Sequence, residues 1–402
     1  MTPSVGMAKR PRDEQTTWKS SRLNDPRIRG WLAQAAVLAI LIAAIVYGIY
    51  NVSHNLTKAG ITTGFTFLGH PAGFDISQTL IPYSSRSTYA DAFVIGLLNT
   101  LLVSFLGMVS ATVLGFFLGV IRLSPNWIVA KMAEAYTEVI RNIPLLLQVL
   151  FWYLAILSPL PGPRAALNLG DAFFLCNRGL QIPRPVFGEN FAATPLALLA
   201  AIVLAVVISR WARRRQLKTG RPFPSLSCGL ALIVAMPLIA LAATGFPLHW
   251  EVPALSGFNF KGGITVLPEL IALWLSLTLY TATFIGEYVR SGILAVDKGQ
   301  REAAYALGHR PWMTYRLIII PQAMRVVTPP LISQYLTLVK NSSLAVVIGY
   351  PDLIHVFAGT ALNQSGQAVE IISITMAVYL FISLVISLVM NWYNKHYALR
   401  GQ

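Results

Sequence analysis

Long runs without charged side chains constrain this chain more than any other feature. Residues 31–50, 92–121, 190–209, 223–250 and 371–394 contain no Asp, Glu, Lys or Arg. A helix rises 1.5 Å per residue, so about 20 apolar residues cross the roughly 30 Å of bilayer hydrocarbon. Three further runs, 142–160, 270–289 and 317–349, are interrupted by proline or charge. We therefore expect an all-α, polytopic membrane protein with about eight transmembrane helices.

The composition excludes a water-soluble core. Charged residues make up 12% of the chain and apolar residues 55%, whereas about a quarter of an average soluble domain is charged. The net charge is +15, and the basic residues gather in alternate loops, with clusters at 9–29, 210–221 and 290–316. The positive-inside rule then places both termini in the cytoplasm. No basic patch carries interleaved aromatic residues, so we do not expect a nucleic-acid partner.

The chain divides unevenly. Residues 1–29 are polar and basic, which predicts a disordered cytoplasmic tail, and residues 30–402 form the transmembrane domain. A loop rich in Pro, Gly and Arg leads into two spans, so the block 161–265 reads as an insertion. The flanking segments, 91–160 and 266–397, make a five-helix core without it.

A polar segment, residues 298–316, separates the sixth and seventh predicted spans and should lie in the cytoplasm. Residues 302–307 are good helix formers, Gly308 suits the left-handed residue that ends a helix, and Pro311 should prevent the helix from resuming. We predict a two-turn helix on the inner surface.

One face of this helix is small and apolar. Ala303, Ala304 and Leu307 are three and four residues apart, and Glu302 supplies an acceptor beside them. Such a face can seat in a groove on another protein. The alternative is an interfacial helix that lies on lipid headgroups.

These residues carry a family resemblance. Glu302-Ala303-Ala304 with Gly308, Ile318 and Pro321 resembles the EAA loop of ABC importer permeases. The segments "EYVRSGILAVDKGQREAAYALG", "LVKNSSLAVVIGYPDL" and "RNIPLLLQVLFWY" are similar to the polar amino-acid branch of that family. The likeness covers residues 92–160 and 267–397. The block between them departs from the short members and resembles the long subunits of broad-range L-amino-acid importers.

The resemblance implies a non-catalytic permease subunit with a type I five-helix core in a bacterial inner membrane. It implies partner ATPases that hold ATP and Mg, a second, related permease and a periplasmic amino-acid-binding protein. The residues that would couple to the ATPase are Gly299, Glu302, Ala303, Ala304, Leu307 and Gly308. The chain itself has no Gly-Lys dipeptide, which a P-loop needs, so ATP must be hydrolysed elsewhere.

Two other classes compete. An ion-coupled secondary transporter needs midplane acids, whereas Glu138 and Glu287 fall near inner span ends. A membrane enzyme with its site in residues 159–266 lacks a catalytic constellation. The six histidines have no metal-ligand spacing, so we expect no metal, cofactor or catalytic site.

The solute path is predicted from polar residues inside spans. Pro329 and Pro330 should break the seventh span, so that the crossing starts near Leu331 and Lys340 lies about 15 Å deep. A buried cation is a functional candidate by default, and it could pair with a substrate carboxylate. A structural ion pair or a helix-capping lysine is an equal alternative. Its polar neighbours are Asn341, Ser342 and Ser343.

A second polar stripe is predicted from Arg141 and Gln148, seven residues apart. It would contact solute, or else pack helices or close the inner gate. Glu287 and Arg290, three residues apart at the end of the sixth span, are expected to form a structural pair.

Overall fold

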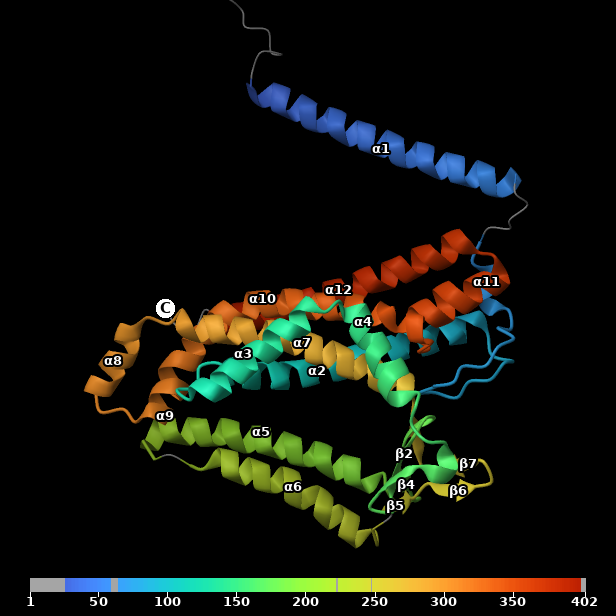
Figure 1. Ribbon diagram of the computed structural model, residues 1–402. Coiled ribbons are helices and arrows are strands. Elements are labelled where there is room, and N and C mark those ends of the chain that lie inside the picture. The colour runs from blue at the N-terminus through green and yellow to red at the C-terminus, as the bar shows by residue number, and fades with distance from the viewer. Residues whose placement is uncertain (1–25, 59–63, 222, 247, 399–402) are drawn as a thin grey trace, which may run out of the picture. The chain divides into compact units, whose positions relative to one another are not determined.

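The computed structural model describes residues 26–58, 64–221, 223–246 and 248–398 (Figure 1). These residues fall into two compact units, divided between Gly64 and Phe65. The first unit holds helix α1 (Pro26–Lys58). It begins inside the tail predicted over residues 1–29, and residues 1–25 of that tail lie outside the described residues.

The second unit is mostly helical. Its helices are η2 (Thr66–Gly69), α2 (Tyr89–Ile121), α3 (Trp127–Asn142), α4 (Leu145–Leu150), η3 (Phe151–Leu157), η4 (Pro163–Ala165), α5 (Ala193–Thr219), α6 (Ser225–Ala243), α7 (Pro268–Leu294), α8 (Lys298–Ala306), α9 (Pro311–Thr314), η5 (Tyr315–Ile319), α10 (Ile320–Asn341), η6 (Ser342–Ile348), η7 (Ile354–Ala361), α11 (Leu362–Ser365) and α12 (Ala368–Ala398). Its strands are β1 (Leu167–Leu169), β2 (Phe173–Cys176), β3 (Gly179–Ile182), β4 (Arg184–Phe187), β5 (Leu248–Glu251), β6 (Ala254–Ser256), β7 (Asn259–Lys261) and β8 (Ile264–Val266).

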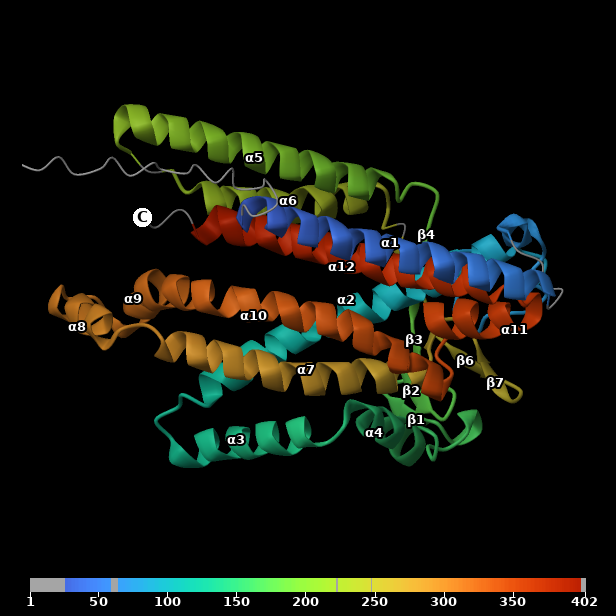
Figure 2. The ribbon, with the colours of Figure 1, turned by 90° about the horizontal axis from the view of Figure 1, so that it is seen from above.

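The number of spans agrees with the prediction. Among the described residues, seven helices are long and apolar enough to cross a membrane. An eighth crossing results if α3 and the α4–η3 segment are counted as one bent span. In both ribbon views α7 lies beside α10 (Figures 1 and 2). The polytopic helical fold is therefore confirmed.

A row of small residues lets α2 approach α7 closely. Gly107, Ala111, Gly115 and Gly119 recur every four residues along α2 and are buried. A Cβ atom added at Gly119 would lie only 2.7 Å from the carbonyl oxygen of Gly286 on α7. Within a bilayer, helix association depends on such close packing because burial away from lipid gains little. This contact makes α2 and α7 one packed pair.

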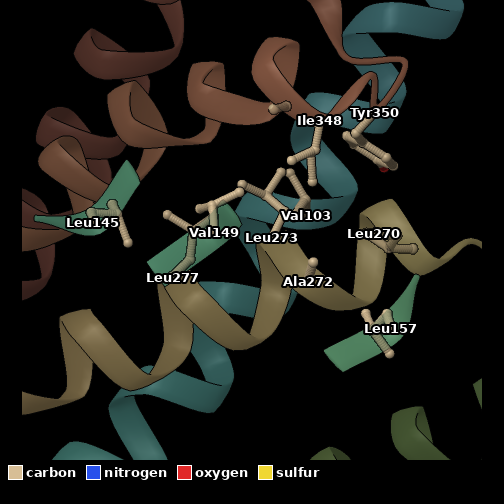
Figure 3. Close-up of a cluster of buried hydrophobic side chains, with 11 residues drawn as sticks. Val103, Leu145, Val149, Leu157, Leu270, Ala272, Leu273, Leu277, Ile348 and Tyr350 are labelled. Atoms are coloured by element: carbon tan, nitrogen blue, oxygen red, sulfur yellow. The ribbon is translucent and has the colours of Figure 1, made fainter. Parts of the chain in front are cut away.

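The core is built by the segments outside the insertion. One buried cluster joins Val103 of α2, Val149 of α4, Leu273 of α7 and Ile348 of η6 (Figure 3). None of the three described core clusters includes a residue of α5 or α6. Those two helices pack mainly on each other. The core thus does not depend on α5 and α6.

The predicted break at Pro329 and Pro330 is wrong. Both prolines lie inside α10, which is continuous from Ile320 to Asn341. Each proline removes one backbone donor, and the carbonyls left unpaired belong to the exposed residues Arg325 and Val326. On the opposite side Val327 and Leu331 are buried in the core. Packing on that side holds the helix together, as it does for prolines in other membrane helices.

The third span differs from its predicted range, residues 142–160. The chain already enters a helix at Trp127, and α3 and the α4–η3 segment meet at an angle of 100°. The bend falls at Ile143 and Pro144, both with extended backbone. A proline disfavours helical geometry in the residue before it, which accounts for the bend at this point.

The structure also contains short strands, which the sequence analysis did not predict. They belong to the block between η3 and α7, where β1, β2, β3 and β8 form one antiparallel sheet. The β4–β5 and β6–β7 pairs are separate two-stranded ribbons. Runs of three or four residues carry too little periodicity to be recognised in a sequence.

Candidate functional site

The segment between α7 and α10 contains the predicted helix. Asp297 precedes α8, and its side chain accepts a hydrogen bond from the backbone N–H of Gly299 at 2.6 Å. Gly308 has φ = +79°, in the left-handed region. Glycine adopts that conformation without steric cost, so the predicted helix end is confirmed. Pro311 does not prevent a helix from resuming, because it occupies the first turn of α9, where its missing N–H is not needed.

The predicted apolar face of this helix divides into two. Ala304 is 1% exposed and packs inside the chain, whereas Leu307 is 79% exposed. Glu302 and Ala303 are also exposed. The three apolar residues therefore do not form one outward surface. Glu302, Ala303 and Leu307 are available to a partner, and Ala304 holds α8 against the segment that follows it.

A cavity of about 220 Å³ lies beneath α8. It is bounded by Leu123 after α2, by Ile293 of α7 and by Tyr315 and Ile319 of η5. Its polar lining includes Arg301 of α8. The helix thus meets the ends of the core helices across a partly open space, not through a solid packed layer.

Three charged residues connect α2 to α7 close to this cavity. Arg290 Nη1 lies 3.1 Å from Glu287 Oε1, so the expected pair is present. Arg122, which follows α2, pairs with the other oxygen of the same carboxylate. The guanidinium side chain of Arg122 is 12% exposed. Glu287 therefore joins the end of α2 to the helix that leads into α8. Arg122 was not among the residues predicted from the sequence.

The helix start on which the depth of Lys340 was predicted is wrong. Because α10 starts at Ile320 instead of Leu331, Lys340 lies about 30 Å along the helix. Its side chain is exposed. The nearby hydroxyls bond to their own helix, since Ser342 donates to Val339 O at 2.8 Å and Ser343 donates to Lys340 O at 2.6 Å. A helix that starts at Ile320 therefore gives no reason to place Lys340, Asn341, Ser342 and Ser343 at the midplane. Their contact with substrate stays a prediction.

The predicted stripe of Arg141 and Gln148 does not exist, because the bend separates them. Gln148 is 5% exposed, and its Nε2 donates to Ile140 O at 2.9 Å and to Ile143 O at 3.0 Å. It therefore caps the end of α3 from the following helix. The carbonyls at a helix end need such partners.

Arg141 points elsewhere and stacks on an aromatic ring of α7. Its Cζ lies 4.6 Å from the centroid of the Phe284 ring, within the range of a cation–π contact. The side chain is exposed in the isolated chain, and the described ion pairs do not include it. Arg141 lies about 21 Å along α3 from Trp127. The guanidinium thus lies against α7 and forms no ion pair with a carboxylate of the described residues.

A buried polar anchor near the start of α2 was missed from the sequence. Asn99 Nδ2 donates to Pro351 O at 2.8 Å, and Leu353 N donates to Thr100 Oγ1 at 3.0 Å. Gly96 allows this approach, since a Cβ atom there would lie 3.0 Å from Leu353 Cα. The polar pair inside an otherwise apolar helix was the available signal, because a buried amide requires partners.

Comparison with known proteins identifies the chain's relatives. YhdX of Escherichia coli K12, named provisionally as an amino-acid ABC transporter permease, is 52% identical over 93% of this chain and 95% of its own. AapQ of Rhizobium johnstonii, a general L-amino acid transport system permease, is 48% identical over 96% of each chain. BztB of Rhodobacter capsulatus, a glutamate/glutamine/aspartate/asparagine transport system permease, is 43% identical over 95% of this chain and 96% of its own.

A family model agrees with these relatives. It is described as the binding-protein-dependent transport system inner membrane component, and it matches residues 193–400. The matched range includes α8 and the core helices α7, α10 and α12. The chain therefore belongs to the family of inner-membrane components of binding-protein-dependent transport systems.

Proposed function

We propose that this chain is a permease subunit of an ATP-driven importer for amino acids. The observation that carries the proposal is its 43% to 52% identity, along nearly the whole chain, to three relatives named as amino-acid permeases. The chain forms part of the solute path and is not itself an enzyme. ATP and Mg belong to a separate subunit, consistent with a sequence that has no Gly-Lys dipeptide for a P-loop.

The proposed substrates are polar or general L-amino acids. AapQ is named for general L-amino acids, and BztB for glutamate, glutamine, aspartate and asparagine. The proposed partners are two ATPases, a second, related permease and a periplasmic amino-acid-binding protein. The proposed location is a bacterial inner membrane with both termini in the cytoplasm. The basic clusters at 210–221 and 290–316 support that orientation.

The energy source is the first test. The purified complex, reconstituted with its ATPase and binding protein in vesicles, should take up amino acid only when ATP is supplied on the ATPase side. An ion-coupled transporter would instead work without ATP as long as an ion gradient is present. Uptake that persists in vesicles with a gradient and no ATP would refute the proposal.

Coupling to the ATPase is assigned to the outward side of α8. Glu302, Ala303 and Leu307 are exposed there, while Ala304 anchors the helix from inside. A helix can bind in a groove of a partner through its exposed apolar side chains, and Leu307 is one such side chain on α8. A push on this surface would reach α7 through the chain and α2 through Glu287, because that carboxylate pairs with Arg122.

Leu307→Arg tests this surface without disturbing the packing of α8. It should reduce the amount of ATPase that copurifies with the permease and lower uptake at least tenfold. Leu217→Arg is the matched control, since Leu217 is 82% exposed and lies near the end of α5. Equal loss in both variants, or unchanged copurification with Leu307→Arg, would remove α8 as the coupling surface.

We assign Arg141 to the solute path, as the group that binds the substrate carboxylate. Its guanidinium is exposed in the isolated chain, rests on Phe284 and is free of the described ion pairs. Charged residues of membrane-spanning segments face partners or water-filled paths and not lipid. The guanidinium fork also matches a carboxylate in geometry. Lys340 is a second candidate, exposed at the far end of α10.

Arg141→Met should raise the KM for uptake about 10- to 150-fold, the range for a hydrogen bond to a charged group. Basal ATPase activity and complex assembly should be unchanged. Lys131→Met is the control, because Lys131 lies on the same helix and pairs with Glu134 at 3.2 Å. An unchanged KM in Arg141→Met would exclude this role.

A further inference from the structure

The inner turn of the α5–α6 hairpin holds a concentrated positive charge. Six basic residues, Arg210, Arg213, Arg214, Arg215, Lys218 and Arg221, fall within twelve positions and are all exposed. Residues 190–250 contain no Asp or Glu, and the ion pairs of the described residues involve none of the six. Clusters of about four to eight Lys or Arg beside a membrane span attract anionic headgroups, so this density favours an anionic partner.

A groove between α5 and α6 opens beside this charge. Its volume is about 290 Å³, and its walls include Ile202, Val206 and Leu230. The helices approach closely at its floor, where a Cβ atom on Gly229 would lie 3.3 Å from Ala205 Cβ. The groove is apolar except for two hydroxyl residues, one on each helix.

Those two hydroxyl residues, Ser209 and Ser225, mark the end of the groove nearest the charge. Ser209 directly precedes Arg210 and lies one helical turn before Arg213. Ser225 is the first residue of α6. The helix α5 continues past this level to Thr219. The basic residues therefore lie just beyond the polar end of the apolar groove.

Aromatic contacts order the turn at the same level. The rings of Trp211 and Phe223 meet edge to face with centroids 5.5 Å apart. Arg215 lies over the Trp211 ring, 5.4 Å from its centroid. Tryptophan prefers the headgroup level of a bilayer. This end of α5 is also the end of the unit at which α8 and α9 lie (Figures 1 and 2).

We propose that the α5–α6 hairpin binds an anionic phospholipid from the membrane leaflet on the α8 side. One acyl chain occupies the groove, and the phosphate group lies among Arg210, Arg213 and Arg214. A soluble acidic protein would satisfy the charge but would leave the apolar groove empty. A phospholipid accounts for both the charge and the groove. Its phosphate would lie among the basic residues and its attached acyl chain in the adjoining apolar groove.

The test uses the purified full-length chain in detergent and native mass spectrometry. The probes are dioleoyl phosphatidylglycerol, dioleoyl phosphatidylcholine and inorganic phosphate. Phosphatidylglycerol should bind with at least tenfold preference over phosphatidylcholine, and phosphate alone should not displace it. Equal binding of the two lipids would exclude a site selective for the headgroup. Displacement by inorganic phosphate would indicate a plain anion site.

Two variants separate the charge from the groove. The triple variant Arg210→Gln, Arg213→Gln, Arg214→Gln should weaken phosphatidylglycerol binding at least tenfold, since each basic residue contributes about fivefold near a charged membrane. Leu230→Trp should weaken it by filling the groove, without a change in net charge. Unchanged binding in either would overturn the proposal.

A second triple variant controls for net charge. It replaces three exposed arginines of the block between η3 and β5 and consists of Arg164→Gln, Arg178→Gln and Arg184→Gln. It should bind phosphatidylglycerol like the original chain. An equal loss would mean that overall charge, not the hairpin, attracts the lipid. None of these measurements needs import, so their failure would leave the proposed function untouched.

Discussion

Replacing Gly119 by alanine should push α2 away from α7. The added Cβ atom would lie 2.7 Å from both Gly286 O and Val289 Cβ. Carbon atoms pack at about 3.5 Å, so the helices must separate by roughly 0.5–0.8 Å. Neither neighbour can yield, since one is helix backbone and the other is a stiff β-branched side chain. Such overpacking costs about 1–3 kcal/mol.

Gly107→Ala is the matched control on the same helix. There the added Cβ atom would lie 3.5 Å from the nearest side-chain atoms of Leu338, an ordinary contact. Both substitutions also gain about 1 kcal/mol of helix propensity. The difference in unfolding free energy between the two variants therefore isolates the steric effect at Gly119. We expect that difference to be about 1–3 kcal/mol, with Gly107→Ala the more stable.

The assay is the thermal midpoint of each purified variant in one detergent, read by the loss of the folded peak in size-exclusion chromatography. In globular domains of 150–250 residues, 1 kcal/mol shifts the midpoint by about 2–4 °C. We expect Gly119→Ala to melt several degrees below Gly107→Ala. Equal midpoints would refute the idea that the contact at Gly119 sets the separation of α2 and α7.

Three further substitutions test separate contacts. Gln148→Leu removes the donors that cap the end of α3. Losing two part-buried hydrogen bonds should lower stability by about 1–3 kcal/mol in the same melting assay, and an unchanged midpoint would contradict the capping role. Arg122→Gln leaves Glu287 with Arg290 as its one cationic partner. ATP-dependent uptake should then fall several-fold while ATPase copurification is retained. Normal uptake would show that the Arg122–Glu287 connection between α2 and α7 is not needed. Asp352→Asn should stabilise the chain at pH 8 by about 1 kcal/mol. Asp352 is fully buried, and its Oδ2 has no hydrogen-bond partner among the described residues, so a charge there is costly. A lower thermal midpoint in the variant would mean that the carboxylate is required.

The spans were predictable because length and absence of charge are enough to identify a membrane helix. The start of α3 at Trp127 was not predicted, because Lys131, Glu134 and Glu138 interrupt its apolar character. It buries Ala133 and Thr137 and leaves much of its surface exposed within this chain. A hydropathy pattern identifies helices that are apolar on every side, and α3 is amphipathic.

Proline was the least reliable guide within the spans. The pair at 329 and 330 was expected to end a helix, yet packing of Val327 and Leu331 keeps α10 continuous. Pro144 was expected inside a span and instead marks the 100° bend. The local backbone effect of proline is the same in both places. Tertiary contacts decide the outcome, and the sequence contains them only implicitly.

For the proposed coupling helix, the end was predicted well, whereas the start and the orientation were not, because α8 begins at Lys298 and not at Glu302. Gly308 ended the helix as expected, because its conformational preference is local. Which alanine faces inward depends on how α8 meets η5, and spacing alone could not distinguish Ala303 from Ala304. The same limit applies to Gln148, whose partners Ile140 and Ile143 lie across a bend that the sequence did not reveal.

The sheet between η3 and α7 has a consequence for how such chains diversify. Strands β3 and β8 pair Leu180 with Val266 and Ile182 with Ile264, so the polypeptide departs and returns at adjoining points. The two ends of the segment between β3 and β8 are thus held together by strand pairing. Changing the length of such a segment adds little loop-closure entropy to the folding of the rest of the chain. Residues 183–263 could therefore be exchanged for a shorter or unrelated module, and α7 would still begin at the same point.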